Sequence, residues 1–293
     1  AGWETRYAFG TVAAVVFFAT VVAHELAHSY AAIRYGVRIK SITLMLFGGV
    51  ASLEEMPKRP RQELTMAFAG PFTSLVIGIG SYGAMLLADT VSSDSVLLEG
   101  TVILLGLIAF YNIILAGFNL LPAFPMDGGR MLRSFLATRM PHLDATRAAA
   151  KVGRAIAVAM GIFGLVTLDF ILIFIALFVY FGAKEEEQAT VITDSLEGLR
   201  VRQLMTDAVQ VVHPDTSVQQ LLDLMLATRH TGFPVVDFGV VGVVTLTDAQ
   251  KLPKERIPYT KVGDIMSRQV VSVHTDVEAP EALRTMTEKG IVR

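Results

Sequence analysis

Two histidines and a glutamate lie within five residues of one another near the start of the chain, in the run His24-Glu25-Leu26-Ala27-His28. On a helix, His24 and His28 are one turn apart on the same face, so both imidazoles can reach one metal ion. Glu25 points partly to the side, where it can hold a water molecule instead of binding the ion. Zinc hydrolases need this division of roles, because the ion lowers the pKa of bound water to about 7 and a carboxylate accepts the proton.

The motif follows a long apolar stretch, which makes its ionisable groups harder to explain as incidental. The residues from Ala8 to Ala23 include no charged side chain. An Asp, Lys or Arg at the centre of a membrane helix costs roughly 2.5–3.5 kcal/mol on insertion scales. A buried structural histidine is the weaker explanation in such a setting. We therefore expect one catalytic Zn²⁺ ion at this motif.

The composition limits the remaining possibilities. The chain has 293 residues, is 53% hydrophobic and has a mean hydropathy of +0.53. A net charge of −2 gives no indication of nucleic-acid binding. The absence of cysteine excludes a thiolate metal site, so any further metal ligand must be His, Asp or Glu. The chain begins with Ala1 and not with Met, and we expect that sequence before it is missing.

Apolar segments predict a polytopic α-helical membrane protein with a soluble C-terminal part. The last segment is shorter than the about 20 residues that a bilayer of about 30 Å requires. Between the first two segments, alternating residues over Ile39–Leu53 indicate a β-hairpin, with an interfacial loop as the alternative. The five expected spans are Tyr7–Ile33, Met66–Ala88, Thr101–Leu121, Ala148–Val166 and Phe170–Gly182.

The charge of the connecting segments predicts an orientation. Arg34–Glu63 and Pro122–Arg154 each carry six Lys or Arg residues, whereas Asp89–Gly100 and Thr167–Asp169 carry none. Basic loops of membrane proteins stay in the cytoplasm. The rule places both basic segments, and everything after Lys184, on the cytoplasmic side of a cell membrane. It also places the zinc motif toward that side.

A carboxylate in the second basic segment is the expected third metal ligand. Catalytic zinc usually has three protein ligands and one open position. Pro122 and Pro125 break the third span at its cytoplasmic end, and Asp127 follows them directly. Irregular backbone at this depth is tolerated only where protein or a water-filled cavity covers it. We therefore predict that Asp127 joins His24 and His28, and the alternative is an N-cap for a helix over 128–139.

Asn119 is the other polar residue of this broken helix end. Its side-chain amide could polarise a carbonyl or bind the substrate backbone near the metal, which would make it a catalytic residue beside Glu25. The alternative is that it caps or bridges the end of the helix. The residues themselves leave both readings open.

The C-terminal part contains an internal repeat at a constant offset of 61 residues. Val201–Thr206 matches Val262–Ser267, and the dipeptide at Val212 matches the one at Val273. Each copy reads as a strand, an Asp-containing turn and an amphipathic helix, and repeats imply stacked equivalent units. We expect a transmembrane core over 1–184, a linker over 185–199, a first repeat over 200–252 and a truncated second repeat over 259–293.

These features resemble the site-2 protease family of intramembrane zinc metalloproteases, in the archaeal and bacterial branch that carries a C-terminal CBS pair. The run His24–His28 matches the family's zinc motif. The family's second motif, N-x-x-P-x-x-x-x-D-G, is matched by Asn119, Pro122, Asp127 and Gly128. The resemblance implies zinc held by two histidines and Asp127, with Glu25 as the general base. It also implies a core of six spans, so that the first would be missing here.

The repeats resemble CBS motifs. In that family a run of the type in Gly242–Asp248 contacts an adenine nucleotide, which implies that Thr245 and Asp248 bind ATP or AMP. Many CBS pairs are structural, so nucleotide binding and a structural role both stay open. CBS pairs often associate, which makes a homodimer through these domains an expectation.

The sequence therefore predicts a zinc metalloendopeptidase that cleaves transmembrane segments of substrate proteins within the bilayer, modulated by a cytoplasmic CBS pair. The competing hypothesis is a nucleotide-regulated transporter or channel for divalent cations. A pore needs metal ligands but no positioned base, so Glu25 between two histidines on one face favours the protease.

Overall fold

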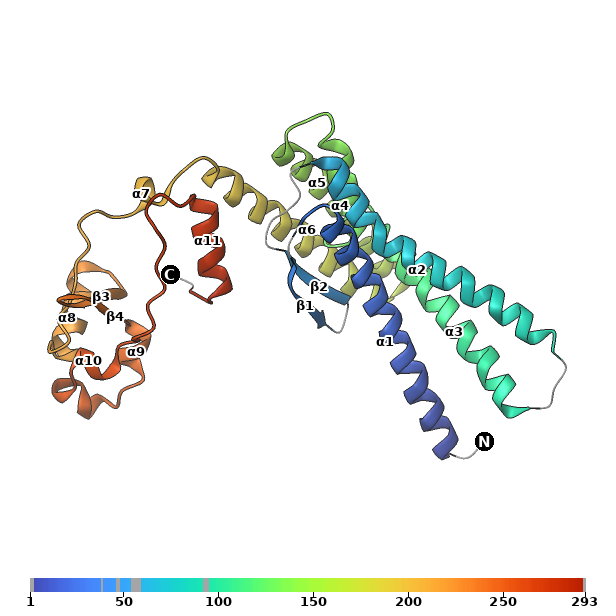
Figure 1. The fold of residues 1–293 in the computed structure, drawn as a ribbon, viewed down its shortest axis with the longest axis horizontal. Coiled ribbons are helices and arrows are strands. Elements are labelled where there is room, and N and C mark those ends of the chain that lie inside the picture. The colour runs from blue at the N-terminus through green and yellow to red at the C-terminus, as the bar shows by residue number, and fades with distance from the viewer. Residues whose placement is uncertain (1–2, 38, 46–47, 54–58, 92–94, 292–293) are drawn as a thin grey trace. The chain divides into compact units, whose positions relative to one another are not determined.

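The computed structural model describes residues 3–37, 39–45, 48–53, 59–91 and 95–291 (Figure 1). The chain divides into two compact units, Ala1–Asp194 and Ser195–Arg293. The first unit contains the zinc motif and the second contains the repeat. We describe each unit by itself.

Long helices build the first unit, because apolar residues dominate these segments and every backbone group of a helix is satisfied internally. Within the described residues, four helices are long and apolar enough to cross a membrane. They confirm four of the expected spans as long apolar helices, while the fifth expected span is the first half of a longer helix, α6, and its crossing stays a prediction. The helices are α1 (Trp3–Arg34), α2 (Pro60–Asp89), α3 (Val96–Asn119), α5 (His142–Thr167) and α6 (Phe170–Leu196).

The expected hairpin between the first two helices is present. Strands β1 (Ile39–Met45) and β2 (Gly48–Leu53) pair antiparallel, with Ile39 opposite Leu53 and Met45 opposite Gly48. The register shifts between Ile39 and Ser41. In Figure 1 the hairpin lies beside α1, and both strands contact that helix.

A buried irregular segment follows α3. It leads into the short helix α4 (Asp127–Leu136). Ala123 and Phe124 are fully buried, and the Phe124–Pro125 peptide bond is cis. Two glycines allow α4 to start against this segment, since a Cβ on Gly128 would lie 2.2 Å from the Leu121 carbonyl oxygen. A Cβ on Gly129 would meet the backbone of Ala123 at 2.6 Å.

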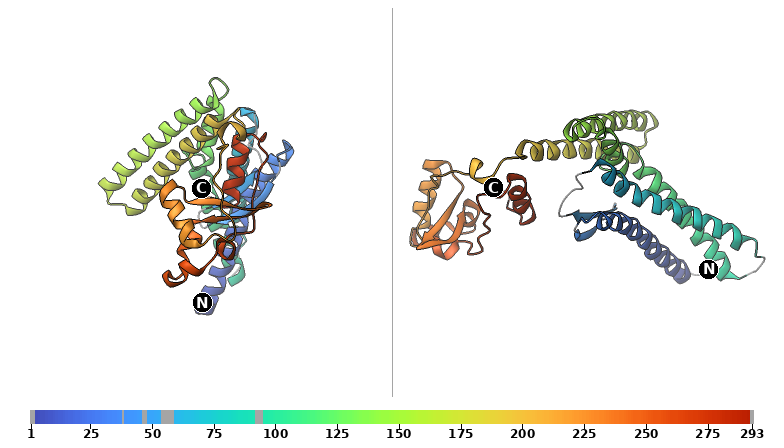
Figure 2. Two further views of the ribbon diagram at one scale, coloured as in Figure 1. Left: turned by 90° about the vertical axis from the view of Figure 1, so that its left-hand side faces the viewer. Right: turned by 45° about the horizontal axis from the view of Figure 1, so that its top comes forward.

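Helices α5 and α6 form a tight antiparallel hairpin, which Figure 2 shows from two directions. The turn places Leu168 in the left-handed region, with φ at 55°. Small residues on α5 allow α6 to approach closely: a Cβ on Gly164 would lie 3.0 Å from the Ile173 side chain. The segment 185–199, expected as a linker, is helical as far as Leu196, because α6 continues through the charged residues that follow Ala183.

A buried arginine connects three helices of this unit. The Arg133 side chain on α4 is 3% exposed and donates from Nε to Glu63 Oε1 of α2 at 2.9 Å. Its Nη1 donates to Glu186 Oε1 of α6 at 2.6 Å, and its guanidinium lies over the Phe124 ring. A second ion pair joins Arg154 of α5 to Glu187 of α6. Buried charges of this kind persist only when they are paired.

The second unit contains both copies of the repeat. The first copy packs α8 (Val218–Thr228) against the antiparallel strands β3 (Gly232–Asp237) and β4 (Gly239–Thr245), with Leu221, Phe233 and Val244 fully buried. The first residues of each copy form backbone hydrogen bonds with the other copy. The Val201 N–H donates to the Val277 carbonyl oxygen, and the N–H of its repeat equivalent, Val262, donates to the Thr216 carbonyl oxygen. The remaining elements are α7 (Val201–Leu204), α9 (Leu246–Gln250), η1 (Lys254–Tyr259), α10 (Val262–Ile265) and α11 (Ala279–Glu288).

Candidate metal centre and active site

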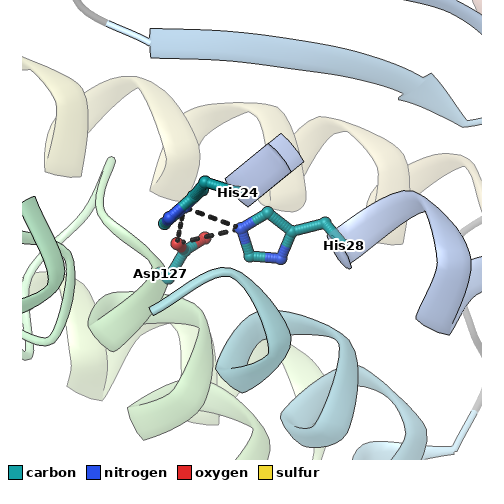
Figure 3. A group of neighbouring side chains, drawn as sticks. All are labelled: His24, His28 and Asp127. Carbon is teal, nitrogen blue, oxygen red and sulfur yellow. Dashed lines mark hydrogen bonds and ion pairs between the residues drawn. The ribbon is translucent and has the colours of Figure 1, made fainter. Parts of the chain in front are cut away.

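Three side chains from two helices converge on one point (Figure 3). His24 and His28 come from α1, one turn apart, and Asp127 is the first residue of α4. His24 Nε2 and His28 Nε2 lie 3.3 Å and 3.1 Å from Asp127 Oδ2, and 3.2 Å from each other. The N-cap of α4 is Met126, so Asp127 does not serve as the N-cap of its helix.

The dimensions of this triangle fit a tetrahedral zinc ion. Zinc bonds to nitrogen and oxygen are about 2.0–2.1 Å long, which places neighbouring ligands of a tetrahedral ion about 3.3 Å apart. The three measured edges lie between 3.1 Å and 3.3 Å. Figure 3 shows the two imidazoles and the carboxylate turned toward a common centre. One face of a coordination tetrahedron is therefore already formed by the protein.

Helix α2 fixes the orientation of both imidazoles. His28 Nδ1 donates to the Met66 carbonyl oxygen at 2.7 Å, and His24 Nδ1 lies 2.8 Å from Ser74 Oγ. Between these two residues, Gly70 leaves the space that the rings occupy, since a Cβ there would lie 2.2 Å from His28 Nε2. Residues 66, 70 and 74 recur every four positions and so share one face of α2.

These contacts also bear on which atoms could bind a metal. A carbonyl oxygen can only accept, so the neutral ring of His28 carries its hydrogen on Nδ1 and directs the lone pair of Nε2 to the centre. That lone pair faces the carboxylate oxygen of Asp127 at 3.1 Å. Electron pairs that converge in this way repel one another unless a cation or a proton lies between them. The donor set, two imidazole nitrogens and a carboxylate, is one that catalytic zinc uses.

The other predicted residues occupy different positions. Glu25 is 9% exposed and lies on α1, rotated by about 60° from His28 at 100° per residue. Asn119 is the last residue of α3 and donates from its side-chain amide to the Leu115 carbonyl oxygen at 3.0 Å. That bond supports the helix end, and a role of Asn119 in substrate binding stays a prediction.

In the second unit, Thr245 and Asp248 lie together at the start of α9. The Thr245 hydroxyl donates to Asp248 Oδ2 at 2.7 Å, and the Thr245 N–H donates to the same oxygen at 3.0 Å. Burial raises the pKa of Asp248, but these hydrogen bonds lower it by more, so that the pKa lies below its ordinary value. The two residues therefore contact each other, and nucleotide binding by them stays a prediction.

Sequence reasoning missed the contributions of α2. Ser74, Gly70 and the Met66 carbonyl hold the histidines, yet none of them belongs to a motif of catalytic residue types. One signal was available. Gly70, Ser74 and Gly78 form a small-xxx-small pattern, which in membrane helices marks a face for close packing.

Comparison with known proteins gives a family for each unit. Residues 12–92 and 83–160 match peptidase family M50, and residues 201–255 and 262–293 match the CBS domain. A zinc metalloprotease of Methanocaldococcus jannaschii is 39% identical over 95% of this chain and 78% of its own length. The protein Rip3 of Mycobacterium tuberculosis is 35% identical over 87% of this chain and 67% of its own length.

A solved structure, the site-2 protease of Methanocaldococcus jannaschii, is 41% identical over 59% of this chain and 76% of that chain, with a TM-score of 0.47. The first unit matches a peptidase family, and a relative that extends through both units is a zinc metalloprotease. Both findings agree with the metal-binding geometry of His24, His28 and Asp127. The chain therefore belongs to peptidase family M50 and is a metalloprotease with two CBS segments after its catalytic unit.

Proposed function

We propose that this metalloprotease works within the cell membrane, where it cleaves peptide bonds in or near transmembrane segments of other proteins. The observation that carries the proposal is the triangle of His24, His28 and Asp127, whose edges of 3.1–3.3 Å match one face of a zinc tetrahedron. Its two histidines belong to a helix that is long and apolar enough to span a bilayer. The charge of the loops supports a site toward the cytoplasmic side.

In this proposal the three residues of the triangle hold one Zn²⁺ ion. When bound, zinc lowers the pKa of a water ligand to about 7 and polarises a carbonyl group. Glu25 acts as the general base: it accepts a proton from the attacking water and returns it to the nitrogen of the leaving amine. Its low exposure of 9% supports this role, because a base shielded from bulk water keeps the proton for the leaving group.

The substrate must reach this site in an extended form, because the carbonyls of a helix are engaged in its own hydrogen bonds. The hairpin β1–β2 supports a route. In the part of the chain that the structure describes, it is a sheet of two strands, so each strand has one outer edge that an unwound segment can pair with. Both strands contact α1, the helix that carries the histidines.

The test is Glu25→Gln in the full chain, purified in detergent and incubated with single-span model substrates. We expect zinc to remain bound in a stoichiometric amount, measured by elemental analysis, while cleavage falls by roughly 10²–10⁴-fold. Glu4→Gln is the matched control, because Glu4 lies in the first turn of the same helix and is exposed. A zinc chelator should abolish cleavage by the wild-type protein.

Three results would contradict the proposal. Full cleavage by Glu25→Gln would exclude this carboxylate as the base. Retention of zinc after His28→Ala and Asp127→Ala together would exclude the triangle as the metal site. Cleavage sites mapped outside the apolar span of every model substrate would move the reaction to the membrane surface.

We also propose that the CBS pair binds an adenine nucleotide at Thr245 and Asp248 and thereby modulates cleavage. The support is the match of both segments to the CBS domain and the hydrogen bond that holds the Thr245 hydroxyl against Asp248 Oδ2 at 2.7 Å. AMP should raise the melting temperature of the full chain and Asp248→Ala should remove the effect. If AMP and ATP change neither melting nor cleavage, the pair is structural.

Dimerisation through this pair also stays a prediction, which light scattering in detergent can check.

A further inference from the structure

A groove between α5 and α6 lies outside the catalytic site and carries an excess of positive charge. It encloses about 750 Å³ and is lined by three cations, Arg147, Arg154 and Lys184, and by one carboxylate, Glu187. Glu187 is paired with Arg154, so the charges of Arg147 and Lys184 remain in excess. The side chain of Arg147 is 45% exposed and lies 3.8 Å from the exposed Asp144, which screens it weakly.

The groove begins where the apolar parts of both helices end. On α5, no charged residue occurs between Arg154 and the turn at Thr167, and on α6 none occurs from Phe170 to Ala183. At 1.5 Å per residue, both uncharged runs are about 20 Å long. The helices are antiparallel and packed together, so Arg154 and Lys184 lie at the same height above the turn. We expect the boundary between acyl chains and headgroups near this height, because the charged residues of both helices begin there.

The residues around this boundary form three levels: a cation on the aqueous side, an aromatic residue at the boundary and apolar side chains below it. Tyr180 lies one turn of α6 below Lys184 and lines the groove at the level where aromatic residues favour the interface. Arg147 lies two turns of α5 beyond Arg154, on the aqueous side. Below the groove, both helices expose apolar side chains, among them Phe163 and Phe174. Cations therefore stand above an apolar surface that acyl chains can cover.

We propose that this groove binds the headgroup of an anionic phospholipid, with the phosphate near Lys184 and the remaining headgroup toward Arg147. Basic pockets between membrane helices recognise anionic lipid headgroups, and net positive charge selects them over zwitterionic ones. The site rests on the membrane placement of α5 and involves none of the residues proposed for catalysis.

The test measures lipid retention by the full chain. The protein is purified in detergent, incubated with equal amounts of phosphatidylglycerol and phosphatidylcholine, and examined by native mass spectrometry. We expect preferential retention of phosphatidylglycerol. The double variant Arg147→Gln with Lys184→Gln should lower that retention roughly 25-fold, because each basic residue near an anionic lipid contributes roughly fivefold in affinity. Arg147→Lys with Lys184→Arg should retain the lipid.

The matched control is Lys151→Gln, which removes an exposed charge from the same helix, between the two arginines, without lining the groove. Its retention should equal that of the wild type. Equal losses in the control and the double variant would show general surface attraction and overturn the proposal, as would no loss in either. Displacement of the lipid by inorganic phosphate at comparable concentration would assign the groove to a free anion instead. Cleavage in detergent is measured in parallel, so a failure here is distinguishable from failure of the protease assignment.

Discussion

Replacement of Gly70 by alanine should disable the metal site through a single methyl group. The new Cβ would lie 2.2 Å from His28 Nε2 and 2.5 Å from His24 Nε2, whereas ordinary contact begins at 3.4 Å. The His28 nitrogen must therefore move by about 1.2 Å and the His24 nitrogen by about 0.9 Å. In a well-formed metal site the ligand distances lie within about 0.2 Å of their ordinary values. Both histidines are held by α2 itself, through Met66 and Ser74, so they cannot move without losing those bonds.

The expected magnitude follows from the cost of overpacking, which is about 1–3 kcal/mol. The higher helix propensity of alanine, roughly 0.5–1 kcal/mol, favours the folded helix with or without zinc and so does not change the zinc affinity. If the strain falls on the metal site, zinc affinity should decrease by about 5- to 150-fold, because 1.4 kcal/mol corresponds to a factor of ten. Cleavage at limiting zinc should decrease in proportion.

The assay is competition for zinc with a fluorescent chelator, using the purified full chain. Gly80→Ala is the matched control, because Gly80 lies on the same helix and a Cβ there would meet nothing within 4 Å. That variant should bind zinc as the wild type does. If Gly70→Ala and Gly80→Ala bind zinc equally well, the packing of α2 against the histidines is not what holds the site open.

Three further predictions concern other contacts. Ser74→Ala should weaken zinc binding 10- to 100-fold in the same competition assay, because it removes the partner of His24 Nδ1; Ser81→Ala on the same helix should not. Arg133→Met should destabilise the first unit by about 3–5 kcal/mol in chemical denaturation, because it leaves the Glu63 carboxylate, 10% exposed, without its counter-charge. Near-normal stability would show that water reaches Glu63. Arg139→Gln is the control, because Arg139 is exposed. Asp248 has a pKa below its ordinary value in the folded chain, so its stabilisation is present above the unfolded pKa of about 3.9 and is lost as the pH falls through the folded pKa. Asp248→Asn should therefore flatten the acid side of the stability profile of the second unit, and an unchanged profile would contradict this.

The sequence was most informative where chemistry and periodicity act locally. The spacing of His24 and His28 predicts one helix face, and the prolines before Asp127 predict a break that positions the third ligand. The structure brings these three residues together. The hairpin over Ile39–Leu53 was likewise readable from alternation, because strand residues point to opposite faces in turn.

Contacts between distant segments were not predictable in this way. Arg133 counted in the sequence as one positive charge of a cytoplasmic loop, but its side chain is buried between Glu63 and Glu186. Nothing in the local pattern distinguishes an arginine that faces water from one that is paired across 70 residues of chain. The extent of α6 was missed for a related reason: charged residues after Ala183 suggest a linker, yet they continue the helix because Glu186 and Glu187 bond to α4 and α5.

The exchange of opening segments between the two CBS copies has a consequence for the order in which the chain can fold. The residues directly after α6, Leu199–Arg202, form their backbone bonds with Thr275–Ala279 in the early part of the second copy. During synthesis the whole of the first copy is made before these partner residues leave the ribosome. The junction after α6 can therefore close only after the first part of the second copy has been made. A stop codon between the copies would remove that closure and leave the start of the first copy open.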